Sequence, residues 1–119
     1  MSEEKFHGSC QCGAVEYEVI GLNLTQTVTC NCSRCQRLGS VLAFAPRSNF
    51  SLLKGQEALS EYLFNKKAIR HQFCKVCGIQ SFSFGATPDG GEMVAVNVNT
   101  LDDVDPRKLS STHADGRSY

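Results

Sequence analysis

Hydrophobic and polar residues alternate along much of the chain, and this alternation predicts strands. In the segment 14–19, Val15, Tyr17 and Val19 share one face, while two glutamates lie on the other. Successive side chains of a strand point to opposite faces, so the pattern is typical of a strand that is buried on one side. Similar alternation, or a short run of β-branched and aromatic residues, predicts further strands over 27–29, 41–44, 51–53, 69–73, 81–84 and 94–98.

Helical patterns are scarce and short. Residues 33–38 are predicted to form one or two helical turns, with Ser33 as the N-cap and Gly39 ending the helix. Asp105 and Pro106 predict another short turn, because aspartate caps helices and proline fits their first position.

The segment 58–65 fits either a strand or a helix, and its β-forming Tyr62, Leu63 and Phe64 favour a strand. The chain has 119 residues, and no linker rich in proline, glycine or serine divides it. These features predict a single domain over 1–119, with a mainly β fold and a few short helical turns.

Charge and hydropathy exclude two classes of function. Lysine and arginine number 12, as do aspartate and glutamate, so the formal net charge is zero. Nucleic-acid binders and polybasic membrane binders carry an excess of positive charge, so we expect neither partner. No apolar run approaches the roughly 18 residues that a membrane-spanning helix needs. The N-terminal segment lacks the apolar stretch of a secretory signal, and we therefore expect a cytoplasmic protein.

Cysteine is the outlier of the composition, with seven residues in 119. An odd number cannot all form disulfides within one chain. In a reducing cytosol, clustered thiols more often bind metal or carry out chemistry. The seven cysteines form three groups, which are Cys10-Gln11-Cys12, Cys30-Asn31-Cys32-Ser33-Arg34-Cys35 and Cys74-Lys75-Val76-Cys77.

The first and third groups are interpreted as two halves of one zinc site. Gly13 and Gly78 follow them, and the residue after a metal-binding knuckle often needs the positive φ that glycine adopts at low cost. Four thiolates match closed, tetrahedral structural zinc, although they also suit iron. Disulfides and inert buried thiols are the alternatives. The predicted ligands are Cys10, Cys12, Cys74 and Cys77, with 61 residues (13–73) between the two pairs.

The second group predicts a reactive site. Cys30, Cys32 and Cys35 would converge where a strand passes into a short helix, and the positive end of the helix lowers thiol pKa. Arg34 and Arg37 add positive charge nearby. Three thiolates leave a zinc ion one open position, which is typical of catalytic or ligand-exchanging sites.

Other interpretations of this cluster remain open. It could be a structural zinc site completed by His71 or another side chain, a redox disulfide between Cys32 and Cys35, or a set of buried thiols. His7, His71 and His113 lie outside any metal-ligand spacing, and we expect them to be hydrogen-bonding or surface residues.

Four segments of the chain resemble the glutathione-dependent formaldehyde-activating enzyme family, also called the centromere-protein-V-like family. They are residues 8–17, 30–35, 70–78 and 96–103, and the resemblance extends from about Phe6 to about Arg117. It implies a β-tent of the Mss4-like superfamily, in which small antiparallel sheets are clamped by a tetracysteine zinc site. Many members carry histidine at the position of Asn31, and we interpret this difference as minor.

The resemblance also implies an activity. Family members join glutathione to formaldehyde to give S-(hydroxymethyl)glutathione, which is a carbon–sulfur lyase reaction in reverse. It implies one structural zinc, held by the four cysteines of the first and third groups. It implies a second site, where relatives bind a catalytic zinc, or glutathione through a sulfur, at the residues Cys30, Cys32 and Cys35.

The leading hypothesis is therefore an enzyme that adds a small thiol to a small aldehyde. A non-catalytic carrier of glutathione or zinc, and a partner-binding scaffold like the Mss4-like chaperones of small GTPases, are the alternatives. A scaffold would have no use for the second cysteine cluster. The cations that could grip substrate carboxylates, unless they are solvated surface charges, are Arg34, Arg37, Lys66, Lys67 and Arg70.

Overall fold

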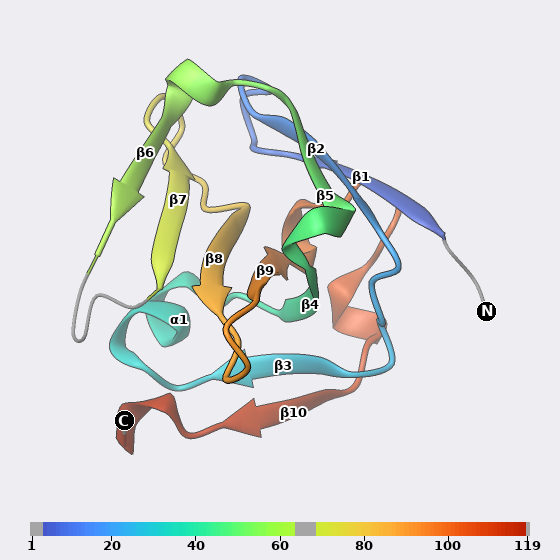
Figure 1. Ribbon diagram of the computed structural model, residues 1–119, viewed down its shortest axis with the longest axis vertical. Coiled ribbons are helices and arrows are strands. Elements are labelled where there is room, and N and C mark those ends of the chain that lie inside the picture. The colour runs from blue at the N-terminus through green and yellow to red at the C-terminus, as the bar shows by residue number, and fades with distance from the viewer. Residues whose placement is uncertain (1–3, 64–68, 119) are drawn as a thin grey trace.

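The computed structural model describes residues 4–63 and 69–118, and its strands form two sheets (Figure 1). The three-stranded sheet has the order β1-β2-β5, with β1 at Lys5–Ser9, β2 at Glu16–Ile20 and β5 at Phe50–Lys54. The seven-stranded sheet has the order β10-β3-β4-β9-β8-β7-β6. Its strands are β3 (Thr27–Cys30), β4 (Leu42–Pro46), β6 (Leu59–Tyr62), β7 (Arg70–Cys74), β8 (Phe82–Ala86), β9 (Glu92–Asn97) and β10 (Ser111–Ala114).

Helical structure among the described residues is limited to short pieces. The α-helix is α1 at Ser33–Leu38. The 3₁₀ turns are Arg47–Asn49, Gln56–Ala58, Val98–Thr100, Pro106–Lys108 and Gly116–Ser118. The described part of the chain contains no helix with the length and apolar character that crossing a membrane requires.

The predicted mainly β fold is confirmed, and each of the predicted strands is present with ends shifted by a few residues. The segment 58–65 contains β6, as expected, while its residues 64 and 65 lie outside the described residues. Asp105 caps the predicted turn, because its side chain accepts a hydrogen bond from the Arg107 N–H, with Pro106 at the start.

Two strands were not predicted, and one of them changes the topology. β1 and β10 are rich in polar residues and lie at sheet edges, so they lack a continuous apolar face. β10 runs parallel to β3, with Ser111 opposite Thr27 and Ala114 opposite Cys30. The expectation of purely antiparallel sheets is therefore wrong for this pair, because the chain returns by a long connection rather than a hairpin.

An aromatic cluster packs the two sheets against each other. Tyr17 and Phe50 come from the three-stranded sheet, and Phe82 and Phe84 come from β8 of the larger sheet. Ring centroids in this cluster are 4.6–5.5 Å apart. Burial of large rings in mutual contact is a major source of folding energy in a domain of this size. The packing also brings the turn after β1 close to the turn after β7.

Candidate metal centre and three-cysteine site

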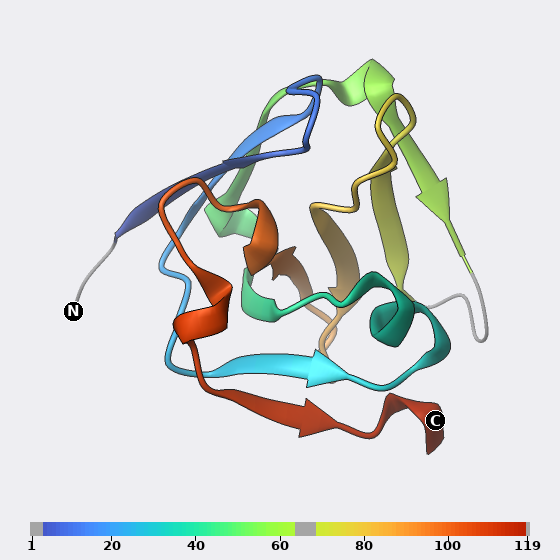
Figure 2. The same ribbon diagram turned by 180° about the vertical axis from the view of Figure 1, so that it is seen from behind.

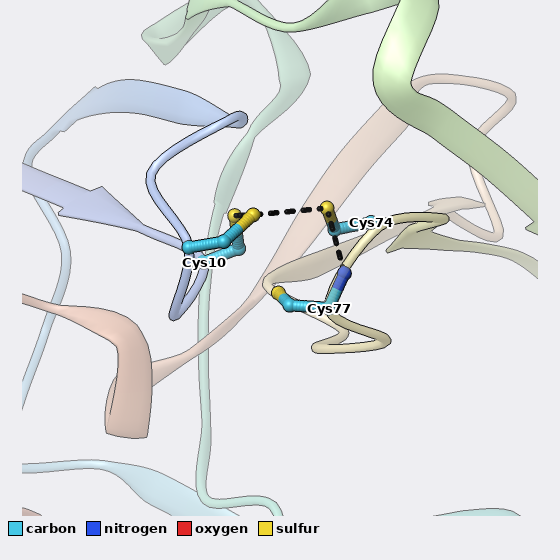
Figure 3. A group of neighbouring side chains, drawn as sticks. Cys10, Cys74 and Cys77 are labelled. Atoms are coloured by element: carbon cyan, nitrogen blue, oxygen red, sulfur yellow. Dashed lines mark hydrogen bonds between the residues drawn. The ribbon is translucent and has the colours of Figure 1, made fainter.

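Four sulfurs from these two turns form a compact cluster, although the two pairs are far apart in sequence (Figure 3). Cys12 Sγ lies 3.7 Å from Cys10 Sγ and 3.8 Å from Cys74 Sγ, and all four sulfurs, with that of Cys77, lie within 4.8 Å of one another. Zinc bound tetrahedrally with Zn–S bonds of about 2.3 Å would place its sulfurs about 3.8 Å apart. The spacing therefore fits zinc, and it is far longer than a disulfide bond.

The two turns around this cluster have the same backbone design. Cys10 N–H donates to Val15 O at 3.1 Å, and Cys74 N–H donates to Ile79 O at 2.9 Å. In both turns the bond joins a cysteine to the residue five positions later. Each turn is a knuckle that wraps its backbone around sulfur.

A glycine with positive φ follows each knuckle, as predicted. Gly13 has φ of 83° and Gly78 has φ of 84°. No atom lies within 4 Å of the position that a Cβ would take at either glycine. The backbone conformation, and not a lack of space, therefore favours glycine here.

Backbone N–H groups donate hydrogen bonds to sulfurs of this cluster, and the pKa of Cys74 and Cys77 lies below its ordinary value. Val15 N–H donates to Cys10 Sγ at 3.4 Å, and Val76 N–H donates to Cys74 Sγ at 3.4 Å. Burial alone raises the pKa of the Cys77 thiol, but hydrogen bonds, led by the Ile79 N–H, outweigh it and lower the pKa to about 6. The hydrogen bond from the backbone of Ala14 lowers the pKa of Cys12, but burial and the hydrogen bonds of the other three cysteines outweigh it and raise that pKa to about 11. Metal ligands must be deprotonated, so the lowered pKa of Cys74 and Cys77 suits a metal site.

The second cluster forms at the junction of β3 and α1. Cys30 is the last residue of β3, Cys32 precedes the helix and Cys35 lies within it. The three sulfurs lie within 4.8 Å of one another, and all three residues are half-buried. The convergence that the sequence predicts is therefore present.

Cys32, and not the predicted Ser33, is the N-cap of α1. Its sulfur accepts a hydrogen bond from the Cys35 N–H at 3.3 Å, and Ser33 is the first residue of the helix. Serine is a common N-cap, but here the cap lies one residue earlier than predicted. The Cys32 sulfur is therefore both the cap and a member of the three-sulfur cluster. Gly39 ends the helix with φ of 67°, as predicted.

The expected lowering of thiol pKa holds for Cys32 but not for Cys35. Burial alone raises the pKa of Cys32, but hydrogen bonds from the backbone and side chain of Cys35 and the backbone of Arg34 outweigh it, so the pKa lies below its ordinary value. Burial, together with the hydrogen bond and charge of Cys32 and the charge of Cys30, raises the pKa of Cys35 to about 12. The cluster therefore holds thiols of unequal acidity.

An open pocket of about 430 Å³ adjoins this cluster and reaches Cys30 and Cys35. Its walls come from β3, from the C-terminal part of α1 and from β10. His113 of β10 lies in this wall, hydrogen-bonded to Thr29. His113 is hydrogen-bonded, as predicted, but its place at this site was not predicted, because only the parallel pairing of β10 with β3 brings it there. The volume suits a small-molecule ligand.

The arginines that sequence analysis singled out are engaged with protein groups. Arg37 donates to Ser33 O at 3.0 Å within α1. Arg70 pairs with Glu92 at 3.7 Å, and its guanidinium lies over the Phe84 ring. The other two cations proposed to grip substrate, Lys66 and Lys67, lie outside the described residues.

Arg34 joins the two cysteine-bearing regions of the molecule. Its guanidinium lies 4.5 Å from the centroid of the Tyr62 ring, and its Nε donates to Gln80 Oε1 at 2.8 Å. Gln80 follows the second knuckle, so this contact ties α1 to the four-sulfur cluster.

The buried side chain of Gln80 in turn contacts His71 Nδ1 at 3.2 Å. Burial, aided by the charge of Arg34, lowers the pKa of His71 to about 4. The imidazole is therefore neutral at pH 7. His71 is not grouped with the three sulfurs, so the idea that it completes a structural zinc site there is wrong.

Replacing Arg34 with methionine is expected to lower the free energy of unfolding by about 1–3 kcal/mol, because it removes the N–H donor to the buried Gln80 side chain. Arg37→Met is the matched control. It loses a hydrogen bond within its own exposed helix and should change stability by less than about 0.5 kcal/mol. Denaturant unfolding at pH 7 measures both variants. Equal destabilisation would contradict the assigned role of Arg34.

The fold and the two clusters define a small β protein whose thiol groups could hold two metal ions. The sequence model of the glutathione-dependent formaldehyde-activating enzyme family matches residues 5–115, and the chain belongs to this family. The family is associated with glutathione-dependent activation of formaldehyde. The crystal structure of a Rhodobacter sphaeroides protein is similar, with 35% identity, a TM-score of 0.77, and coverage of 89% of this chain and 99% of that chain.

Proposed function

We propose that this protein binds glutathione, or a similar small thiol, at the three-cysteine site and catalyses its addition to formaldehyde. The product would be S-(hydroxymethyl)glutathione, and the reverse reaction is that of a carbon–sulfur lyase. One observation carries this proposal. Cys30, Cys32 and Cys35 form a three-sulfur cluster that opens onto a pocket, separate from the four-sulfur cluster.

We propose that the two clusters divide their roles. The residues Cys10, Cys12, Cys74 and Cys77 would hold a structural zinc. Cys10 is 3% exposed and Cys74 is 1% exposed, and four protein sulfurs leave no coordination position for a substrate. Cys30, Cys32 and Cys35 would hold the second zinc. A zinc ion with three protein ligands supplies an open position and lowers the pKa of the group bound there.

The residues around the pocket would hold the thiol and the formaldehyde next to each other. The pocket would admit the thiol beside Cys30 and Cys35, which line it. In the reaction, the thiol first releases its proton to water, the thiolate sulfur then forms a bond to the carbonyl carbon of formaldehyde, and the electron pair of the C=O π bond moves to oxygen. The oxyanion then takes a proton from water, which reaches the open pocket. Binding the two reactants next to each other in a reactive orientation would make this step effectively unimolecular, which lowers its entropic barrier.

The expected result is a faster exchange between free formaldehyde and S-(hydroxymethyl)glutathione when the protein is added. Exchange NMR of formaldehyde and glutathione measures this rate with and without the protein, against the spontaneous reaction. A Cys32→Ser variant at equal concentration controls for reaction at surface thiols. Exchange no faster than the spontaneous rate would reject the enzymatic function. Binding of glutathione without faster exchange would identify a carrier instead.

A further inference from the structure

The C-terminal segment Ser111–Ser118 forms the outer wall of the three-cysteine site. Figures 1 and 2 show β10 beside β3, with the following turn near the start of α1. Gly116 makes the closest approach, since a Cβ added to it would lie 2.4 Å from Cys30 Sγ and 3.2 Å from Cys32 Cβ. Only a residue without a side chain lets the backbone pass this close to the sulfur.

Asn31 holds this wall in place from its position between two of the cysteines. Its Oδ1 accepts a hydrogen bond from the Arg117 N–H at 2.9 Å, and its Nδ2 donates to Asp115 Oδ1 at 3.0 Å. Its backbone N–H also donates to Ala114 O at 3.2 Å. An amide side chain supplies both the donor and the acceptor that this arrangement needs. Asn31 is therefore a positioning residue for the wall.

Arg117 extends from the wall to the helix at the edge of the pocket. Its Nη2 donates to Gln36 Oε1 at 2.7 Å, and Gln36 lines the pocket together with Cys30 and Cys35. Within the part of the chain that the structure describes, the Arg117 guanidinium makes this one side-chain hydrogen bond and no ion pair within 4 Å. Arginine carries five N–H donors, and the bond to Gln36 uses one of them.

Asp115 is the acidic group near this guanidinium, and the two opposite charges attract each other. Asp115 also lines the pocket, but its carboxylate accepts hydrogen bonds from Ser118 Oγ at 2.6 Å and from Asn31 Nδ2. These bonds, with the charge of Arg117 as a smaller cause, lower the pKa of Asp115. The carboxylate keeps its negative charge, but its hydrogen bonds lie within the wall, whereas the Arg117 guanidinium donates to Gln36.

We propose that Arg117 binds a carboxylate of the incoming thiol and so selects anionic thiols, such as glutathione, over uncharged ones. The inference rests on the proposed function, which places the thiol at Cys30, Cys32 and Cys35. A guanidinium forms paired, charge-assisted hydrogen bonds with a carboxylate. Asn31 holds the backbone of Arg117 beside the three-cysteine cluster, and the hydrogen bond to Gln36 directs its guanidinium toward α1.

The test compares two ligands that differ in their carboxylates. Calorimetry on the zinc-loaded, reduced protein measures the Kd of glutathione and of glutathione diethyl ester. Arg117→Gln is expected to weaken glutathione binding about tenfold, as expected for the loss of one charge-assisted pair, and to leave ester binding unchanged. Arg107→Gln is the matched control, because Arg107 contacts Asp105 on a 3₁₀ turn whose residues do not line the pocket. It should bind both ligands like the wild type.

Three results would overturn the inference. They are an unchanged glutathione affinity in Arg117→Gln, an equal weakening for both ligands, and a wild-type protein that does not bind glutathione. Failure of the proposed function gives a different result. In that case glutathione binding would depend on Arg117, but the wild type would not speed the exchange of formaldehyde.

Discussion

Replacing Cys77 with serine is expected to release the metal from the four-sulfur cluster and to unfold most of the protein. A serine hydroxyl does not ionise at neutral pH, so the site loses one of its four anionic ligands. Structural zinc contributes roughly 10 kcal/mol or more to the folding of small domains, which is comparable with the total stability of about 5–15 kcal/mol of a typical domain. Here the metal would also close a loop of 61 residues, 13–73.

Circular dichroism and zinc analysis under reducing conditions measure this effect. Val76→Ser is the matched control, because Val76 lies in the same knuckle with its side chain 71% exposed. It should keep its zinc and its unfolding temperature, since surface substitutions change stability by about 0.5 kcal/mol or less. Cys10→Ser should behave like Cys77→Ser. A well-folded, metal-free form of either variant would contradict a structural site.

Cys32→Ser is expected to keep the fold but to lose the second metal and all acceleration of the formaldehyde reaction. The fold should survive because serine is itself a good N-cap and can accept the hydrogen bond from the Cys35 N–H that Cys32 Sγ now accepts. The exchange rate should fall to the spontaneous rate, because Cys30 and Cys35 alone supply only two of the three thiolate ligands that the second zinc would need.

Exchange NMR and thermal unfolding together test this variant. Ser33→Ala is the control, since Ser33 lies next to Cys32 but is not the cap, and its activity should match that of the wild type. If the unfolding temperature of Cys32→Ser fell as far as that of Cys77→Ser, the three-cysteine cluster would be structural rather than catalytic.

Local patterns were sufficient to predict much of this molecule. The apolar alternation around Tyr17 predicts β2, and the matching Cys-Gly endings predict that the first and third cysteine groups meet. Both signals lie within a few residues of sequence. The two groups can be matched across a long stretch of sequence because each is followed by glycine and supplies two thiols, and a tetrahedral zinc site needs four.

The wall of the three-cysteine site could not be predicted in this way. Ser111–Ala114 is a polar edge strand that pairs with β3. Its sequence therefore lacks the alternation of hydrophobic and polar residues by which the other strands were predicted. His113 reaches the pocket only through that pairing, and Arg117, whose backbone is held by the side chain of Asn31, contacts the pocket residue Gln36. Asn31 itself was interpreted as a minor difference. Its role depends on residues more than 80 positions later in the chain, which a local pattern does not identify.

The zinc content of the purified, reduced protein tests most directly the claim that the two cysteine clusters are separate metal sites with different roles. Elemental analysis is expected to give two zinc ions per chain for the wild type. The folded Cys32→Ser variant should retain one. One zinc per wild-type chain would contradict a metal at Cys30, Cys32 and Cys35, and a folded wild-type protein with none would contradict both sites.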